Sequence, residues 1–120
     1  MSQREETYHG FSISQTDYDD ITALTPTGSI TFENCAELRI LLERASERPQ
    51  PTILLGGRRI GAVDSEALEL LMEWHGRLSG AGGSLKLVAL TDTCADILTA
   101  TRLVHVLNVY EDIQQAIQDG

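Results

Sequence analysis

Apolar and polar residues follow two distinct periodicities along the chain. Phe11–Ser14 alternates between apolar and polar residues, as a half-buried strand does, and Ile21–Leu24 follows after a turn rich in aspartate. These segments predict an antiparallel pair of strands, which Ser29–Phe32 would resume. Ile53–Leu55 and Leu85–Leu90 are mainly apolar runs, which is typical of parallel strands covered on both faces.

Between the strands, apolar residues recur at intervals of three and four, which places them on one face of a helix. The first helix opens at Asn34, with Glu37 close to a capping-box position. The second runs from about Ser65 to Leu78. Asp92 can cap a third helix, which extends to about Thr101, and Glu111 starts the last one. The residues expected on the buried faces of the four helices are, in chain order, Leu38, Leu41, Leu42 and Ala45; Ala67, Leu71, Trp74 and Leu78; Cys94, Ala95 and Leu98; and Ile113, Ala116 and Ile117.

With a short last strand within 104–110, the predicted order of elements is ββαβαβαβα. Strands that alternate with helices indicate parallel pairing and right-handed crossovers. The fold class is therefore α/β, with one domain over 8–120. Its sheet is expected to be mixed but mainly parallel, with about four to five strands and helices packed on it. Residues 1–7 are polar and are expected to form a disordered N-terminal segment.

The net charge of the chain limits the kinds of partner that it is expected to bind. Of the 120 residues, 42% are apolar and 22% charged, as in an ordinary single domain, and the formal net charge is −9. Because phosphate backbones are bound by Lys and Arg, this charge argues against nucleic acid and anionic membranes as partners. No apolar run is long enough for direct membrane insertion and no signal peptide is recognisable, so we expect a cytoplasmic protein. Cys35 and Cys94 are expected to be free thiols.

One passage combines a strand, a loop and a capped helix start. Ile53–Leu55 leads into a loop rich in glycine and arginine, 56–61, and then into the second helix. Asp64 or Ser65 can cap that helix, because a short side-chain oxygen accepts a bond from a free amide of the first turn. From the residues alone, the passage is either only a helix start or the beginning of a docking face for a basic partner, lined by Glu66, Glu69, Glu73 and Arg77.

No catalytic motif accompanies this passage. The 56–61 loop lacks the ending of a P-loop and the spacing of a dinucleotide-binding fingerprint. Zinc-binding spacings and a nucleophile elbow are absent from the sequence, and its three histidines are scattered. We therefore expect a protein that is not an enzyme and that needs no metal or cofactor. A nucleotide-binding function is a weaker hypothesis, which rests on the glycine and arginine loop alone.

The order of elements and the passage from Ile53 to Leu68 resemble a STAS domain, the family of anti-sigma-factor antagonists and of the cytoplasmic tails of sulfate transporters. In that family a buried strand leads into a loop that ends in a hydrophobic residue and Asp-Ser-Ser/Thr-Gly-Leu at a helix start. Thr25–Leu38 also resembles the stretch before the family's first helix. The resemblance covers about 11–120 and implies a bacterial module for signal transduction and transcription regulation through phosphorylation-controlled protein–protein interaction.

Two positions depart from the family pattern. Asp64 matches the family's aspartate and Ser65 its first hydroxyl residue, but the position that antagonists phosphorylate is Glu66, and the following glycine is Ala67. Glu66 cannot accept phosphate, yet it places one fixed charge where phosphorylation adds about −1.5 to −2. The domain is then either locked out of the phosphoswitch or suited to a partner that never used it. Ser65 stays a candidate phosphorylation site, or it is a cap residue only.

The resemblance implies an anti-sigma factor antagonist, that is, an anti-anti-sigma factor, as the leading function. Its partner would be an anti-sigma factor or a histidine-kinase-like ATPase, bound through the 58–66 loop and the second helix. The residues expected to bind it are Arg58, Arg59, Asp64, Ser65, Glu66, Glu69 and Glu73. The alternative is an accessory STAS subunit of a membrane transport system for lipids or anions, which would bind a transporter ATPase subunit.

Overall fold

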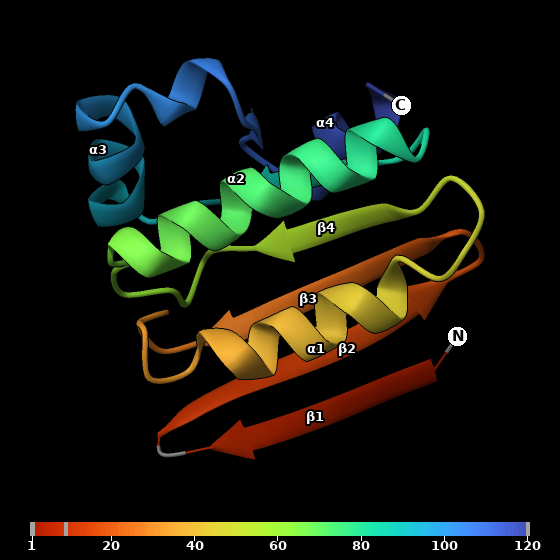
Figure 1. Ribbon diagram of the computed structural model, residues 1–120, viewed down its shortest axis with the longest axis horizontal. Coiled ribbons are helices and arrows are strands. Elements are labelled where there is room, and N and C mark those ends of the chain that lie inside the picture. Colours follow the sequence, from red (N-terminus) through yellow and green to blue (C-terminus); the bar gives the residue numbers. More distant parts are fainter. Residues whose placement is uncertain (1, 9, 120) are drawn as a thin grey trace.

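Six strands form one sheet in the computed structural model, which describes residues 2–8 and 10–119 (Figure 1). The strands lie side by side in their order along the chain. The first three pair antiparallel and the last four, from the third onward, pair in parallel. The strands are β1 Ser2–Tyr8, β2 Phe11–Tyr18, β3 Ile21–Thr27, β4 Thr52–Gly56, β5 Ser84–Val88 and β6 Asn108–Tyr110.

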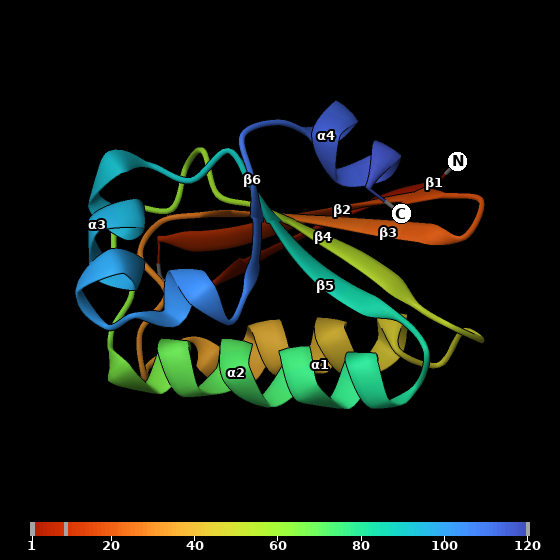
Figure 2. The same ribbon diagram turned by 90° about the horizontal axis from the view of Figure 1, so that it is seen from above.

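Helices cover the two faces of the sheet unequally (Figure 2). The helices are α1 Cys35–Ala45, α2 Ser65–Gly80, α3 Asp92–Ala100 and α4 Ile113–Gln118, with a 3-10 turn, η1, at Leu103–His105. The helices α1 and α2 lie together on one face, whereas α4 lies on the other. This arrangement confirms the α/β fold and the alternation of strands and helices that the sequence predicts.

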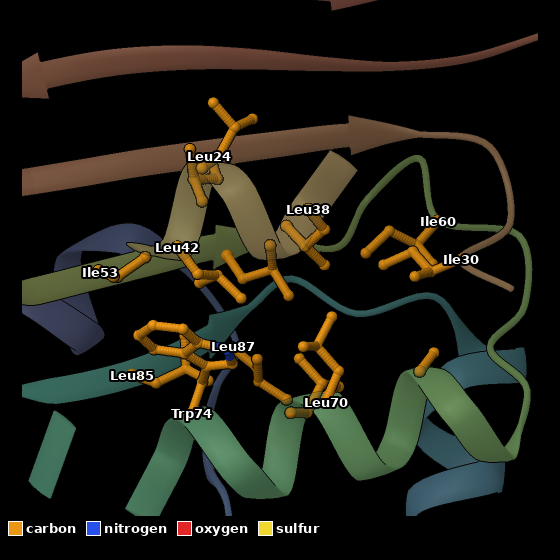
Figure 3. Close-up of a cluster of buried hydrophobic side chains, with 14 of the residues drawn as sticks. Leu24, Ile30, Leu38, Leu42, Ile53, Ile60, Leu70, Trp74, Leu85 and Leu87 are labelled. Atoms are coloured by element: carbon orange, nitrogen blue, oxygen red, sulfur yellow. The ribbon is translucent and has the colours of Figure 1, made fainter. Parts of the chain in front are cut away.

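The main hydrophobic core lies between the sheet and the α1–α2 layer. The apolar stripe predicted for α2 is confirmed, because its members are buried there together with Leu70. Trp74 points from α2 toward the sheet, among leucines and isoleucines of the strands (Figure 3). The other face has a much smaller cluster, in which Leu54, Val88 and Ala116 are the buried members. Most of the free energy from apolar burial therefore resides on the α1–α2 side.

The N-terminal segment differs from the prediction. Residues 2–7, which the polar sequence led us to expect as disordered, belong to β1, which pairs with β2 from Ser2↔Asp17 to Tyr8↔Phe11. Met1, the first residue of that predicted segment, lies outside the described residues. The sheet therefore has six strands rather than the expected four to five. An edge strand needs hydrogen-bonding partners on one side only and tolerates polar residues, so its sequence lacks the apolar pattern of an inner strand.

Three local predictions are also corrected. Ser29–Phe32 does not resume the second strand, since only Ile30 bridges to Val63. Asn34 precedes α1, but its side chain makes no cap bond, because its Oδ1 accepts from the amide of Thr31 instead. The third helix does begin at Asp92, but the side chain of Thr91 caps it.

The last helix is wrongly predicted in its start and in its buried face. It begins at Ile113 after the cap Asp112, and only Ala116 is buried, whereas Ile113 and Ile117 are 49% and 50% exposed. A side chain from inside the sheet holds α4 in place. The ammonium of Lys86, which is only 6% exposed, donates a 2.6 Å bond to the carbonyl of Ala116. This bond satisfies one of the carbonyls that a helix end leaves free.

A second contact joins α4 to the sheet, and it makes the stability of the domain depend on pH in the alkaline range. The hydroxyl of Tyr110 donates to the carboxylate of Asp119, which raises the pKa of Tyr110 from 10.0 to about 12. Because the folded protein holds this proton more tightly, the stabilisation is fully present below pH 10 and is lost as the pH rises through about 12. Urea midpoints measured across this range should fall more steeply for the native chain than for Tyr110→Phe. Equal slopes would contradict the assignment.

Candidate functional site

The carboxylate of Asp64 joins the start of α2 to the loop before α1. One oxygen, Oδ1, accepts from the amide of Ala67 at 2.9 Å, and the other, Oδ2, accepts from the amide of Phe32 at 2.8 Å. The first bond is the N-cap that the sequence predicts. The second links residues 32 positions apart and was not predicted. Asp64 therefore uses both oxygens inside the protein, which is a structural role.

Backbone bonds fix these two loops against each other. The amide of Ile30 donates to the carbonyl of Ala62 at 2.9 Å, and the amide of Asp64 donates back to the carbonyl of Ile30 at 3.2 Å. Farther along, the amide of Gly28 donates to the carbonyl of Arg59 at 2.9 Å. The side chains of Ile30 and Ile60 are buried in the main core. The beginnings of α1 and α2 are consequently held side by side on a rigid base.

An exposed aromatic side chain lies on this base. Phe32 is 65% exposed, whereas the chain's other phenylalanine, Phe11, is buried in the core. Glu33 follows Phe32 in the chain, and the first turns of α2, which Asp64 joins to Phe32, carry the exposed residues Ser65, Glu66 and Glu69. We call Phe32, Glu33, Ser65, Glu66 and Glu69 the docking surface. Aromatic residues are enriched among the side chains that anchor protein interfaces.

Sequence reasoning missed Phe32. Its sequence context predicts the end of a strand, where an alternating side chain would be half buried. The signal that was available is its place between Gly28 and the helix start at Asn34, in a stretch with few other apolar residues. A large aromatic residue in such a loop has no regular element to cover it.

The pKa of the Cys35 thiol shows that this side chain lies close to the carboxylates at the start of α2. Burial raises the pKa of Cys35, and the neighbouring carboxylates of Asp64 and Glu66 raise it further. The thiol therefore stays protonated at neutral pH and is a poor nucleophile. Cys94 is buried and free, so both cysteines are free thiols, as expected.

Glu73 differs from the other acidic residues of α2. Its carboxylate accepts a 2.7 Å bond from the guanidinium of Arg39 on α1 and a 3.4 Å bond from Arg77. The hydrogen bond from Arg39 lowers the pKa of Glu73. Arg77 also lies 4.3 Å from the ring centroid of Trp74. Glu73 thus joins α1 to α2, and its charge is largely matched within the protein.

Arg58 and Arg59 lie apart from the docking surface. Both side chains are exposed and line a groove beside α4, together with Asp112 and Ile113. The loop after β4 starts on the α4 side of the sheet and passes the C-terminal ends of the parallel strands to reach the start of α2 on the other side (Figure 2). The residues expected to form one binding surface are therefore divided between two faces of the sheet.

Within 2–8 and 10–119, no group of three or more histidine, cysteine, aspartate or glutamate side chains is arranged to hold a metal ion. In the same part of the chain, every helix is too short or too polar to cross a bilayer.

Comparison with known families decides the identity of the domain. Residues 14–109 match the family model described as "Mlab, STAS domain". The chain belongs to the STAS domain family. A comparison with curated proteins gives no match.

Solved structures share the STAS fold at low sequence identity. An anti-sigma factor antagonist from Mycobacterium paratuberculosis superposes with a TM-score of 0.80 at 16% identity, over 91% of this chain and 92% of that one. A STAS domain protein from Planctomyces limnophilus gives 0.78 at 18% identity, over 89% and 96%. A sulfate transporter family protein from Wolinella succinogenes gives 0.69 at 21% identity, over 81% of each chain. These likenesses show the fold and leave the role of this STAS domain open.

Proposed function

We propose that this STAS domain is a non-catalytic regulatory module that binds a partner protein through the docking surface, as an anti-sigma factor antagonist does. The observation that carries the proposal is Phe32, which is 65% exposed at a place where bonds to Asp64 hold the backbone. A rigid aromatic anchor loses little conformational entropy on binding. The fold similarity to an anti-sigma factor antagonist agrees with this function.

The charges around Phe32 define the chemistry of the partner. Glu33, Glu66 and Glu69 are exposed, and none of the ion pairs found among the described residues involves them. The partner surface should therefore be basic and should contain an apolar socket for the phenyl ring. An anti-sigma factor or histidine-kinase-like ATPase with such a surface is the proposed partner.

A second candidate is an accessory subunit of a membrane transport system for lipids or anions. Glu66 favours this candidate, because a carboxylate at the position where antagonists accept phosphate cannot be switched in that way. The fold similarity to a sulfate transporter family protein agrees with it. The partner would then be a transporter ATPase subunit, bound through the same docking surface.

We expect Phe32→Ser to weaken binding of the true partner by about tenfold or more, because truncating a central aromatic anchor costs about 1.4–2 kcal/mol or more. Glu66→Lys should slow association and make it less dependent on salt. Titration of the purified chain against the anti-sigma factor or kinase-like ATPase and against the transporter ATPase subunit of the same genome checks both changes. If the chain binds only one of these two classes of protein, that result decides between the two functions.

The matched control is Val106→Ser, which removes an apolar side chain that is 45% exposed beside η1, away from the docking surface. It should leave the affinity unchanged. Ser65 gives a further comparison: Ser65→Ala should bind normally, whereas a phosphate on Ser65 would add about −1.5 to −2 charges beside Glu66 and alter the affinity. Full affinity of Phe32→Ser and Glu66→Lys for a bound partner would refute the docking surface.

A further inference from the structure

The outer face of α1 carries a line of apolar residues that the core does not use. Phe32, Ala36 and Ile40 follow one another at intervals of four residues, and all three are exposed. The helical turn begins before Cys35, because the amide of Cys35 donates to the carbonyl of Thr31 at 2.9 Å. Side chains four residues apart lie above one another on a helix, so the three positions extend for about 12 Å along one side of α1. We call Phe32, Ala36 and Ile40 the apolar stripe.

Acidic side chains flank the apolar stripe on both helices of this layer. Glu33, Glu43 and Glu47 are exposed on or next to α1, and Glu66 and Glu69 are exposed on α2. The two helices lie side by side with their starts at the same end (Figures 1 and 2). None of the ion pairs found within 2–8 and 10–119 involves these five carboxylates. The layer therefore presents apolar contact area together with negative charge that is not paired within the protein.

A hollow of about 120 Å³ lies next to the apolar stripe at Ile40, and Glu37, Leu41 and Arg44 form its other walls. It is smaller than the volume of about 300 Å³ at which small-molecule sites begin, so it suits a single side chain. The Oε2 atom of Glu37 is buried, and no group of the described residues donates a hydrogen bond to it. A buried acceptor without a donor is unfavourable. A side chain with an apolar stem and an N–H donor, such as lysine, would therefore complete this wall.

We propose that the partner binds here through a basic amphipathic helix that lies along the apolar stripe, an inference that rests on the proposed function. Such a helix has an apolar side chain at every third or fourth position, so about two of its turns match the length of the stripe. Its lysines and arginines, on either side of that apolar face, would meet Glu66 and Glu69 on α2 and Glu43 on α1. An extended segment would turn alternate side chains away from the surface and would match fewer of these groups. The same carboxylates disfavour an anionic bilayer as the occupant.

Fluorescence anisotropy with a labelled synthetic peptide tests this proposal. The probe is about 18 residues long, with leucine at helical spacing and lysine at the other positions. At an ionic strength of about 0.15 M, the native chain should bind this peptide saturably, with a Kd of about 100 µM or tighter. A peptide of the same composition in which leucine and lysine alternate should bind at least about tenfold more weakly, because it has the same charge but no apolar helical face.

Ile40→Ser should weaken binding of the helical peptide at least about fivefold, because it removes an apolar contact. The matched control is Ile117→Ser: Ile40 and Ile117 are 48% and 50% exposed, and Ile117 belongs to α4, on the opposite face of the sheet. The control should bind the peptide like the native chain. Glu37→Gln should weaken binding more than Glu47→Gln, which removes the same charge outside the hollow. Equal losses within either pair of variants, or equal binding of the two peptides, would overturn the proposal.

Titration against the true partner separates this inference from the proposed function. Ile40→Ser should weaken binding of that partner, as Phe32→Ser does. If Phe32→Ser loses affinity and Ile40→Ser keeps it, the docking surface is right and the helix proposal is wrong. If both variants bind the partner at full affinity, the proposed function fails as well. A chain that sediments as a dimer, and as a monomer after Ile40→Ser, would also overturn the proposal, because a second copy would then occupy the apolar stripe.

Discussion

Replacing Gly83 with alanine is expected to destabilise the domain by about 3 kcal/mol or more, a large part of the 5–15 kcal/mol typical of a domain. Gly83 joins α2 to β5, and its amide donates to the carbonyl of Leu78 at 2.8 Å. A Cβ at this position would lie 2.8 Å from both the backbone nitrogen and the carbonyl carbon of Pro51. Relief would require a backbone shift next to the bond from the amide of Ser84 to the carbonyl of Pro51.

Urea unfolding followed by the fluorescence of Trp74, the chain's only tryptophan, measures the loss. Gly76→Ala is the matched control, because Gly76 is exposed inside α2 and an added Cβ there would meet no atom within 4 Å apart from the adjoining helix backbone. That variant should be more stable than the native chain by about 0.5–1 kcal/mol, the difference in helix propensity. If both variants unfold at the native midpoint, the close approach of Gly83 to Pro51 is wrong.

The second large effect is expected for Asp64→Ala, which should lower the free energy of unfolding by about 2 kcal/mol. It removes the N-cap of α2, which contributes about 1 kcal/mol. It also removes the charge-assisted bond to the amide of Phe32, whose contribution is smaller than that of a buried bond because it is exposed to solvent. Asp64→Asn should cost about half as much, since an amide keeps only one acceptor oxygen. Chemical denaturation with the same fluorescence probe measures both.

Glu66→Gln is the control for Asp64, because Glu66 lies in the same first turn and its charge also faces the start of the helix. Loss of that favourable charge should cost at most about 0.5 kcal/mol. A cost for Asp64→Ala no larger than this would show that its two bonds contribute little. Because Asp64 supports the backbone under Phe32, its substitutions would disturb binding indirectly. Phe32 and Glu66 are therefore the better positions for testing the partner surface.

The parts of the fold that local sequence determines could be predicted. The start of α2 at Asp64 and its buried stripe around Trp74 follow from a cap and from helical periodicity, which need no distant residue. The last helix could not be predicted in detail, because its isoleucines have the spacing of a buried helix face. A helix this short buries little, and here the side chain that it buries is Ala116, while Ile113 stays half exposed.

The candidate site shows the same division between local and distant effects. The sequence places Arg58, Arg59 and Ser65 within one short stretch, but the loop passes from one face of the sheet to the other and separates the arginines from Ser65. The pairing of Glu73 with Arg39 spans two helices, so spacing along α2 could not show it. The exposure of Phe32 depends on bonds between two loops that are distant in sequence.

The unequal covering of the two sheet faces should determine the order in which the molecule opens. The layer of α4 has a small apolar cluster and the bond from Lys86, so local opening there should require much less free energy than global unfolding. Amide hydrogens of α4 should then exchange with solvent before those of α2.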